Sequence, residues 1–136
     1  MCRYEGIKVN KWSSIICATL LVGCANKPYE PTSTIYSQKY TSHSDERTKI
    51  RVHRVQQLTG AGLGEKCPLI LKVDNTEVAG LQQNQFVDLY LNNGTHNLSV
   101  RFSCALTQWR KTLTVVADGQ YQEIQTEQGA AGQYRM

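Results

Sequence analysis

Apolar and polar residues alternate with a period of two along most of the second half of the chain. The alternation is clearest near residue 100, where Leu98, Val100, Phe102 and Cys104 share one face and polar residues occupy the other. Six further segments are alternating or rich in β-branched residues: 49–55, 68–73, 77–81, 85–91, 108–116 and 120–126. Because successive side chains of a strand point to opposite faces, this pattern predicts about seven short strands.

Turn-forming residues separate the predicted strands. Asp74-Asn75 and Asp118-Gly119 follow apolar segments, and Asn92-Asn93-Gly94 is typical of a β-hairpin turn because Asn and Gly tolerate positive φ. No stretch of about 12 residues shows helical spacing. We therefore expect an all-β fold, a small antiparallel β-sandwich of about seven strands, over residues 48–128.

The N-terminal part of the chain has a different pattern. Residues 1–11 are polar with a basic excess, and residues 12–22 form an apolar run of 11 residues. A helix that crosses the hydrocarbon core of a bilayer needs about 20 apolar residues. The run therefore predicts a secretion signal over residues 1–23 and not a transmembrane helix.

The signal ends in Leu21-Val22-Gly23-Cys24, which resembles the lipobox of bacterial lipoproteins. The resemblance implies cleavage before Cys24, a diacylglyceryl thioether on its sulfur and acylation of its new amino group. This chemistry requires a cysteine because the thiolate is the nucleophile. Ala25, in place of the Asp that retains such proteins in the inner membrane, favours the outer membrane. The alternative is a buried hydrophobic helix that ends in a cysteine by chance.

Residues 24–47 have the composition of a linker. They contain Pro28, Pro31, many Ser and Thr residues and few aliphatic ones. We expect a flexible tether of about 20 residues, with a root-mean-square span of roughly 25 Å. We also expect residues 129–136 to form a frayed C-terminal tail.

The plan of the predicted strands resembles a known family. Residues 72–81, 85–91 and 93–100 follow the order strand, turn, short strand ending in Leu, aromatic-containing strand, turn, strand. This is similar to the small β-domain of bacterial lipoproteins called domain of unknown function 2846, itself similar to the PEGA domain. The likeness covers about residues 50–128; Asn75 and Asn93 replace the usual Gly and Pro but keep turn chemistry. The resemblance implies fold and envelope location and implies no activity.

Two of the five cysteines remain once the signal and the lipidation site are set aside. Cys2 and Cys17 lie in the signal and Cys24 is the predicted lipidation site, which leaves Cys67 and Cys104. An even pair in an oxidising compartment predicts a disulfide between them, either across neighbouring strands or between sheets.

Two other uses of this cysteine pair are weaker. A metal site would combine Cys67 and Cys104 with His53 and His96, but the close C-x₂-C or H-x₃-H pairs that fix two ligands on one turn are missing. A redox-active pair would need a C-x-x-C motif. We expect no metal and no cofactor.

Charge and motifs exclude several function classes. The formal net charge is +4, and residues 1–23 hold three basic and one acidic residue, which leaves 12 basic and 10 acidic residues. This balance gives no nucleic-acid signal. The glycine-rich loop 60–64 lacks the G-x-G-x-x-G spacing, and no G-x-S-x-G elbow is present. We expect a protein that is not an enzyme.

Basic and aromatic residues leave two binding surfaces open. A basic face toward an anionic partner, or simply a solvated sheet face, would contain Lys49, Arg51, Arg54, Arg101, Arg110 and Lys111. Stacking platforms for a glycan would be Tyr36, Tyr40, Tyr90 and Trp109.

These observations predict a lipid-anchored protein of the bacterial outer membrane that faces the periplasm. Its expected role is a non-catalytic interaction or scaffold module that contacts the membrane through its anchor and binds an envelope protein at an edge strand. The first alternative is a peptidoglycan- or glycan-binding lipoprotein, with Tyr90 and Trp109 as candidate binding residues. The second alternative is an envelope enzyme or an enzyme inhibitor.

Overall fold

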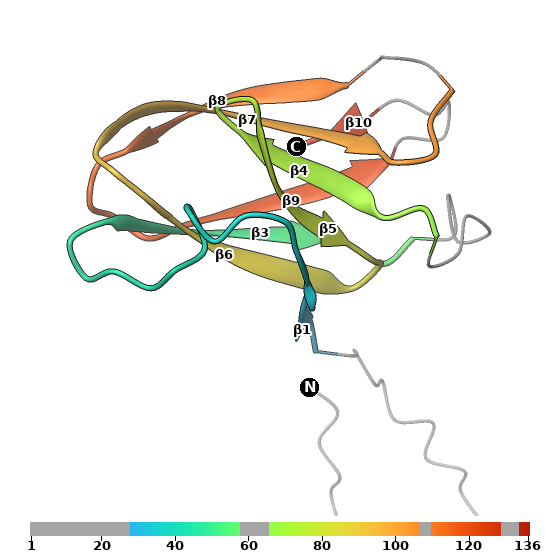
Figure 1. The fold of residues 1–136 in the computed structure, drawn as a ribbon, viewed down its shortest axis with the longest axis horizontal. Helices are drawn as coiled ribbons and strands as arrows, with labels where there is room; N and C mark the ends of the chain where they lie inside the picture. The colour runs from blue at the N-terminus through green and yellow to red at the C-terminus, as the bar shows by residue number, and fades with distance from the viewer. Residues whose placement is uncertain (1–27, 58–65, 107–109, 129–133) are drawn as a thin grey trace, which may run out of the picture.

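The computed structural model describes residues 28–57, 66–106, 110–128 and 134–136, which form ten β-strands in two sheets (Figure 1). Sheet A has the strand order β1 (Glu30–Pro31), β6 (Gln85–Leu91), β3 (Thr48–Arg54), β9 (Gln122–Gln128) and β10 (Tyr134–Arg135). Sheet B has the order β2 (Thr34–Ile35), β5 (Thr76–Leu81), β4 (Leu69–Val73), β7 (Gly94–Phe102) and β8 (Lys111–Ala117). The described residues contain no helix, and the all-β prediction is confirmed.

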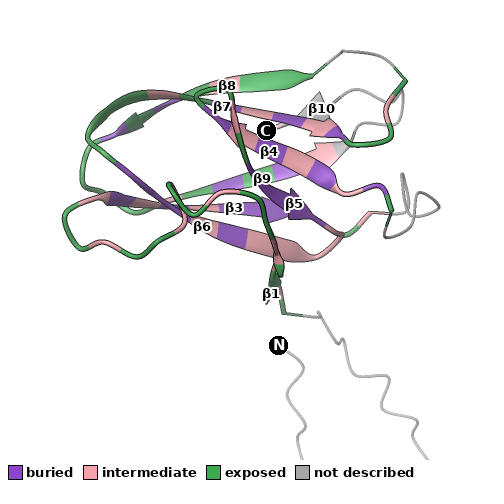
Figure 2. Cartoon of the chain, in the orientation of Figure 1, coloured by how far each residue is buried: buried purple, intermediate pink, exposed green. Residues whose placement is uncertain are grey.

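The core lies between the two sheets (Figure 2). Along β7, Leu98, Val100 and Phe102 are buried, as their alternation predicts, whereas Cys104 is exposed because the strand ends at Phe102. The largest fully buried aliphatic side chains come from both sheets: Ile50, Leu71, Leu81, Leu89, Leu91 and Leu98. Each such side chain contributes about 1.5–3 kcal/mol through its removal from water. This burial is the main force that holds the sheets together.

The seven longer strands match the predicted segments, but their connections differ from the prediction at two turns. Asp74 and Asn75, with φ of 48° and 67°, form the tight turn of the β4–β5 hairpin. The expected hairpin at Asn92-Asn93-Gly94 is wrong, because β6 belongs to sheet A and β7 to sheet B. Asp118-Gly119 likewise connects β8 to β9 across the sandwich. Turn residues determine the local backbone conformation, whereas the packing of the core determines which strands pair with each other.

Two pairs of strands are parallel, which departs from the antiparallel sandwich expected. β3 pairs with β9 in parallel from Ile50 opposite Gln122 to Arg54 opposite Thr126. β1 pairs in parallel with β6. Parallel neighbours need a crossover connection, and five strands, four of them in sheet B, lie between β3 and β9 in the sequence.

The part of the expected linker that the structure describes, residues 28–47, lies along the sandwich, and we call it the N-terminal strap. Its two short strands pair with one edge strand of each sheet, β1 with β6 and β2 with β5. Backbone hydrogen bonds fix it further, with Thr32 N–H donating to Phe86 O and Tyr36 N–H to Val78 O. Strand edges expose unpaired N–H and C=O groups, and the strap satisfies them. Residues 24–27 lie outside the described part.

The C-terminal tail is partly ordered where fraying was expected. Tyr134 and Arg135 form β10, opposite Gln128 and Glu127 of β9, and Met136 packs against the core. Backbone pairing to the free edge of β9 stabilises this end of the chain. Residues 129–133 lie outside the described residues.

Candidate functional site

Several residues singled out from the sequence lie outside the described residues. These are the signal segment 1–23 with Leu21, Val22 and Gly23, the lipidation site Cys24, the glycine-rich loop 60–64 and the candidate stacking residue Trp109. Their roles stay predictions.

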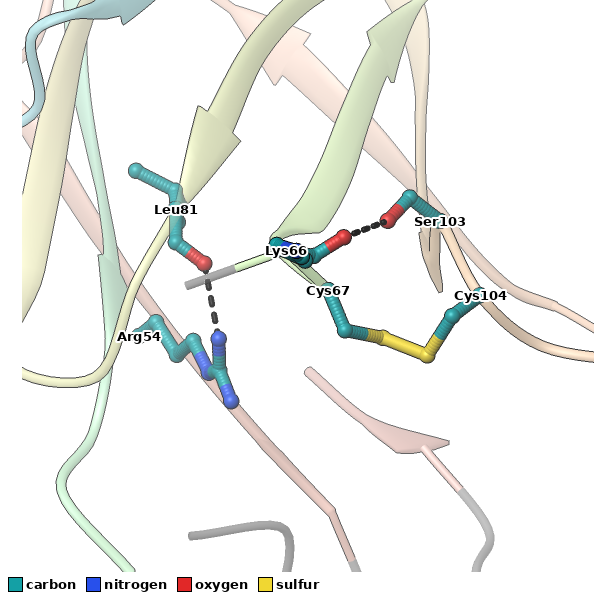
Figure 3. The surroundings of a disulfide bond; sticks show 6 residues. All are labelled: Arg54, Lys66, Cys67, Leu81, Ser103 and Cys104. Atoms are coloured by element: carbon teal, nitrogen blue, oxygen red, sulfur yellow. Dashed lines mark hydrogen bonds between the residues drawn. A yellow bond between two sulfur atoms is a disulfide. The ribbon is translucent and has the colours of Figure 1, made fainter. Parts of the chain in front are cut away.

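The predicted cysteine pair forms a disulfide (Figure 3). Cys67 lies just before β4 and is 2% exposed, and Cys104 lies just after β7. Their Cα atoms are 5.3 Å apart. Because Leu69 of β4 pairs with Phe102 of β7, the bond joins neighbouring strands within sheet B, the cross-strand form of the two expected. It closes the end of the β4–β7 ladder.

The two histidines of the alternative metal site lie in other surroundings. His53 is in β3 of sheet A, and His96 contacts Asp74 at the β4–β5 turn. With both cysteines used in the disulfide, these four side chains do not converge. No group of three or more His, Cys, Asp or Glu side chains within the described ranges has a metal-binding arrangement.

The outer face of sheet A carries paired charges. Arg51 donates two hydrogen bonds to the Asp88 carboxylate, at 2.7 and 2.9 Å, and Lys49 Nζ lies 3.6 Å from the same group. Partial burial opposes ionisation of Asp88, but the hydrogen bonds and charge of Arg51 outweigh it and lower the pKa of Asp88. Tyr121 donates to Glu123 at 2.6 Å; partial burial and this hydrogen bond raise the pKa of Tyr121 to about 12. The ionic side chains on this face pair with neighbours on the same face, which is typical of a structural role. We call this row of paired side chains the sheet A ladder.

His53 lies in an aromatic site beside this ladder. Its ring centroid is 4.4 Å from that of Tyr29 in the strap and 6.1 Å from that of Phe86. Its Nδ1 atom is buried without a hydrogen-bond partner, and its Nε2 atom lies 3.9 Å from Glu123. Desolvation lowers the pKa of His53, although the Glu123 carboxylate works in the opposite direction. The neutral His53 ring therefore packs against Tyr29 and Phe86 and helps to hold the strap on sheet A.

Tyr90 does not offer the open stacking surface expected of a glycan-binding residue. It is only 9% exposed, and the His43 ring lies in a T-shaped arrangement 5.1 Å from its centroid. Its backbone N–H donates to Tyr40 O at 2.7 Å, which fixes the strap. Tyr90 is outward-facing on β6 but is covered by strap residues, a contact that alternation alone does not reveal.

The expected basic face is divided by the fold. Lys49 and Arg51 belong to the sheet A ladder, whereas Arg101 and Arg110 lie on the outer face of sheet B. Arg54 points inward, is 6% exposed and donates to Leu81 O at 2.8 Å (Figure 3). Because these side chains have different orientations, one continuous basic face is wrong.

A pocket of about 310 Å³ on sheet B is the site that the sequence did not reveal as a unit. Its lining residues come from the strap, from β4, β5 and β7, and from the positions just after β7 and just before β8: Tyr36, Ile70, Lys72, Glu77, Ser99, Val100, Arg101, Ser103 and Arg110. The register explains the gathering, because Ile70 pairs with Arg101 and Lys72 pairs with both Ser99 and Glu77. The polar positions of the 97–104 alternation were the available signal. We call this site the sheet B pocket.

The turn at the β4–β5 hairpin carries a third polar cluster. His96 Nδ1 is 2.7 Å from Asp74 Oδ2, and His96 Nε2 is 2.7 Å from Asn92 O. Burial disfavours the charged ring, but both hydrogen bonds outweigh it and raise the pKa of His96. Asp74 also accepts from Asn97 N–H at 2.9 Å. Because both partners of His96 are acceptors, the protonated ring donates from both nitrogens. These two hydrogen bonds link the β4–β5 turn to the connection between β6 and β7.

A scan against protein-family models found no matching family, and searches of curated proteins and of solved structures found no match. Over the ranges that the structure describes, no helix has the length and apolar character required to cross a membrane.

Proposed function

We propose that this chain is a lipid-anchored protein of the bacterial cell envelope whose β-sandwich is a non-catalytic interaction module held close to the membrane. The lipobox-like Leu21-Val22-Gly23-Cys24 and the likeness to domain of unknown function 2846 support the anchor and the envelope location. Ala25 favours the outer membrane, with the domain in the periplasm. The cross-strand disulfide between Cys67 and Cys104 fits an oxidising compartment.

The observation that carries the proposal is the short sequence separation between Cys24 and the docked strap. Pro28 O accepts a hydrogen bond from the Asn84 side chain, and Glu30 already pairs with Gln85 in β1. Only residues 25–27 separate Cys24 from the described domain. Four Cα steps span at most roughly 14 Å. A domain coupled this tightly to its anchor presents the β5–β6 connection, where Asn84 lies, toward the lipid surface.

The surfaces of the domain support a binding role. The ionic side chains of sheet A pair with one another, whereas the sheet B pocket is concave and gathers cationic and hydroxyl side chains. Concave sites with a few convergent polar groups are where small ligands bind. This pocket favours the glycan-binding alternative.

An in-cell crosslinking experiment tests the proposal. Tagged full-length protein is compared with Cys24→Ala and with a form that carries about 15 Gly/Ser residues inserted after Ala25, which adds roughly 20 Å of flexible reach. We expect a discrete crosslinked partner for the wild-type chain only, because both changes remove the domain from its membrane-proximal position. A crosslinking pattern that is the same in all three forms would contradict the proposal.

A further inference from the structure

The sheet B pocket combines a cationic lining with one exposed aromatic ring. Three lining side chains are cationic, Lys72, Arg101 and Arg110, and one is anionic, Glu77, which gives a formal net charge of +2. Lys72 Nζ lies 4.0 Å from Glu77 Oε1, so the acidic group is matched by the lysine. Arg101 and Arg110 add two guanidinium groups to the lining. A guanidinium presents a fork of donors that matches the two oxygens of a carboxylate or a phosphate.

Tyr36 forms a wall of the pocket, and its position depends on Gly80. The Tyr36 backbone N–H donates to Val78 O at 2.8 Å, which fixes this part of the strap to β5. A Cβ atom at Gly80 would lie 2.9 Å from the Tyr36 hydroxyl oxygen and 3.2 Å from Pro68 Cβ. The absence of a side chain at Gly80 thus lets the phenol lie over the strand. Tyr36 remains 47% exposed, so part of the ring is accessible to a ligand.

The size and the remaining donors restrict the ligand further. A volume of about 310 Å³ is at the lower end of the range for small-molecule sites, about 300–1,000 Å³. Ser99 and Ser103 supply hydroxyl groups beside the arginines, and Ile70 supplies an apolar surface. An oxyanion, a ring that packs on an aromatic face and several hydroxyl groups are the features of a charged sugar.

We propose that the sheet B pocket binds one anionic sugar residue, with its carboxylate or phosphate at Arg101 and Arg110 and its ring against Tyr36. This assignment rests on the proposed role as an envelope binding module and gives that module a ligand class. Sugars with a carboxylate occur in cell-wall glycan, and sugars with a phosphate occur in phosphorylated glycolipid. The shared chemistry is an oxyanion on a pyranose ring.

The test is calorimetric titration of the full-length, detergent-solubilised protein with four probes. The probes are N-acetylmuramic acid, an N-acetylglucosamine phosphate, uncharged N-acetylglucosamine and inorganic phosphate. We expect saturable binding of at least one anionic sugar, tighter than that of the neutral sugar and of phosphate alone. The tighter of the two anionic sugars distinguishes a carboxylate source from a phosphate source.

Variants locate the binding in the pocket. Arg101→Gln and Arg110→Gln should each weaken binding roughly ten- to hundredfold, because each removes a charge-assisted hydrogen bond. Tyr36→Leu should weaken the sugar and leave inorganic phosphate unchanged. The matched control is Lys111→Gln, which removes the same charge from the residue next to Arg110 but outside the pocket lining. Circular dichroism spectra and melting curves establish that each variant is folded.

Three outcomes would overturn the assignment. They are no saturable binding of either anionic sugar, equal affinity for inorganic phosphate and the anionic sugars, and equal loss of binding in Lys111→Gln and the arginine variants. A failure here leaves anchor-dependent crosslinking in cells unaffected, so the pocket assignment and the proposed function fail separately.

Discussion

Removal of the Cys67–Cys104 disulfide is expected to lower the free energy of unfolding by about 4 kcal/mol. The two cysteines are 37 residues apart in the sequence. In the chain-entropy model, a loop of this length loses roughly 13 cal/mol/K of denatured-state entropy, which is about 4 kcal/mol at room temperature. Because small domains are stable by only about 5–15 kcal/mol, this bond supplies a large share of the total.

The perturbation is the double variant Cys67→Ala/Cys104→Ala, which leaves no free thiol from this pair. Cys67 is 2% exposed, so its replacement adds a small packing cost, whereas Cys104 is exposed and adds none of that kind. Urea unfolding followed by far-ultraviolet circular dichroism gives the free energy of unfolding and the m value, which rises if the unlinked denatured state is more extended.

Two controls separate the crosslink from other effects of substitution. Wild-type protein reduced with dithiothreitol should lose slightly less stability than the double variant, since both lack the bond but only the variant lacks the buried Cys67 side chain. Ser103→Ala, which changes the residue beside Cys104 and removes a long 3.5 Å hydrogen bond to Lys66 O, should change stability by less than about 1 kcal/mol. A loss below about 1 kcal/mol in both the reduced protein and the double variant would refute the reasoning.

Three further predictions concern the two histidines and the glycine beneath the strap. The pKa of His96 is raised in the folded state, so the protonated ring stabilises the fold below the unfolded value of 6.5, and this contribution is lost as pH rises through the folded pKa. In urea titrations, His96→Gln should therefore cost more stability at about pH 5 than at about pH 9. The pKa of His53 is lowered in the folded state, so the free energy of unfolding falls as pH drops below 6.5. His53→Phe should therefore lose less of this free energy between about pH 7 and pH 5 than the wild-type protein does. The same pH dependence in both proteins would contradict this. Gly80→Ala should displace the Tyr36 hydroxyl, which would lie 2.9 Å from the new Cβ, and should cost about 1 kcal/mol because Pro68 Cβ and Thr34 Cγ2, at 3.2 Å, must also shift slightly; the check is thermal unfolding, and an unchanged melting temperature would contradict this.

The strands were predictable because their signal is local. The residue-by-residue alternation around Val100 and the β-branched run around Val52 give a period of two that any register of pairing must respect. The pairing itself was not predictable: Asn93 and Gly94 favour a turn in either topology, and only the packing of β6 and β7 into different sheets decides between them. The parallel pairing of β3 with β9 has the same origin.

The sequence did not predict the docking of the strap or the sheet B pocket, and the reason is the same for both. Strands β1 and β2 have two residues each, too few to show periodicity, and they form because the edges of β6 and β5 provide hydrogen-bond partners. The sheet B pocket depends on the same docking, which brings Tyr36 to Lys72 and Arg101 from distant parts of the chain. Individual basic residues could be named from the sequence, but their common surface follows from the strand register.

The most direct test of the central claim is the intact mass of the mature protein extracted from membranes, with fragmentation of its N-terminal peptide. The proposed function predicts a chain that begins at Cys24 and carries a diacylglyceryl group on its sulfur and an acyl group on its amino nitrogen. Mass loss on hydrolysis of the ester bonds would identify the acyl chains. An unmodified chain that still begins at Met1, or one cleaved at another residue with an unmodified Cys24, would contradict the account.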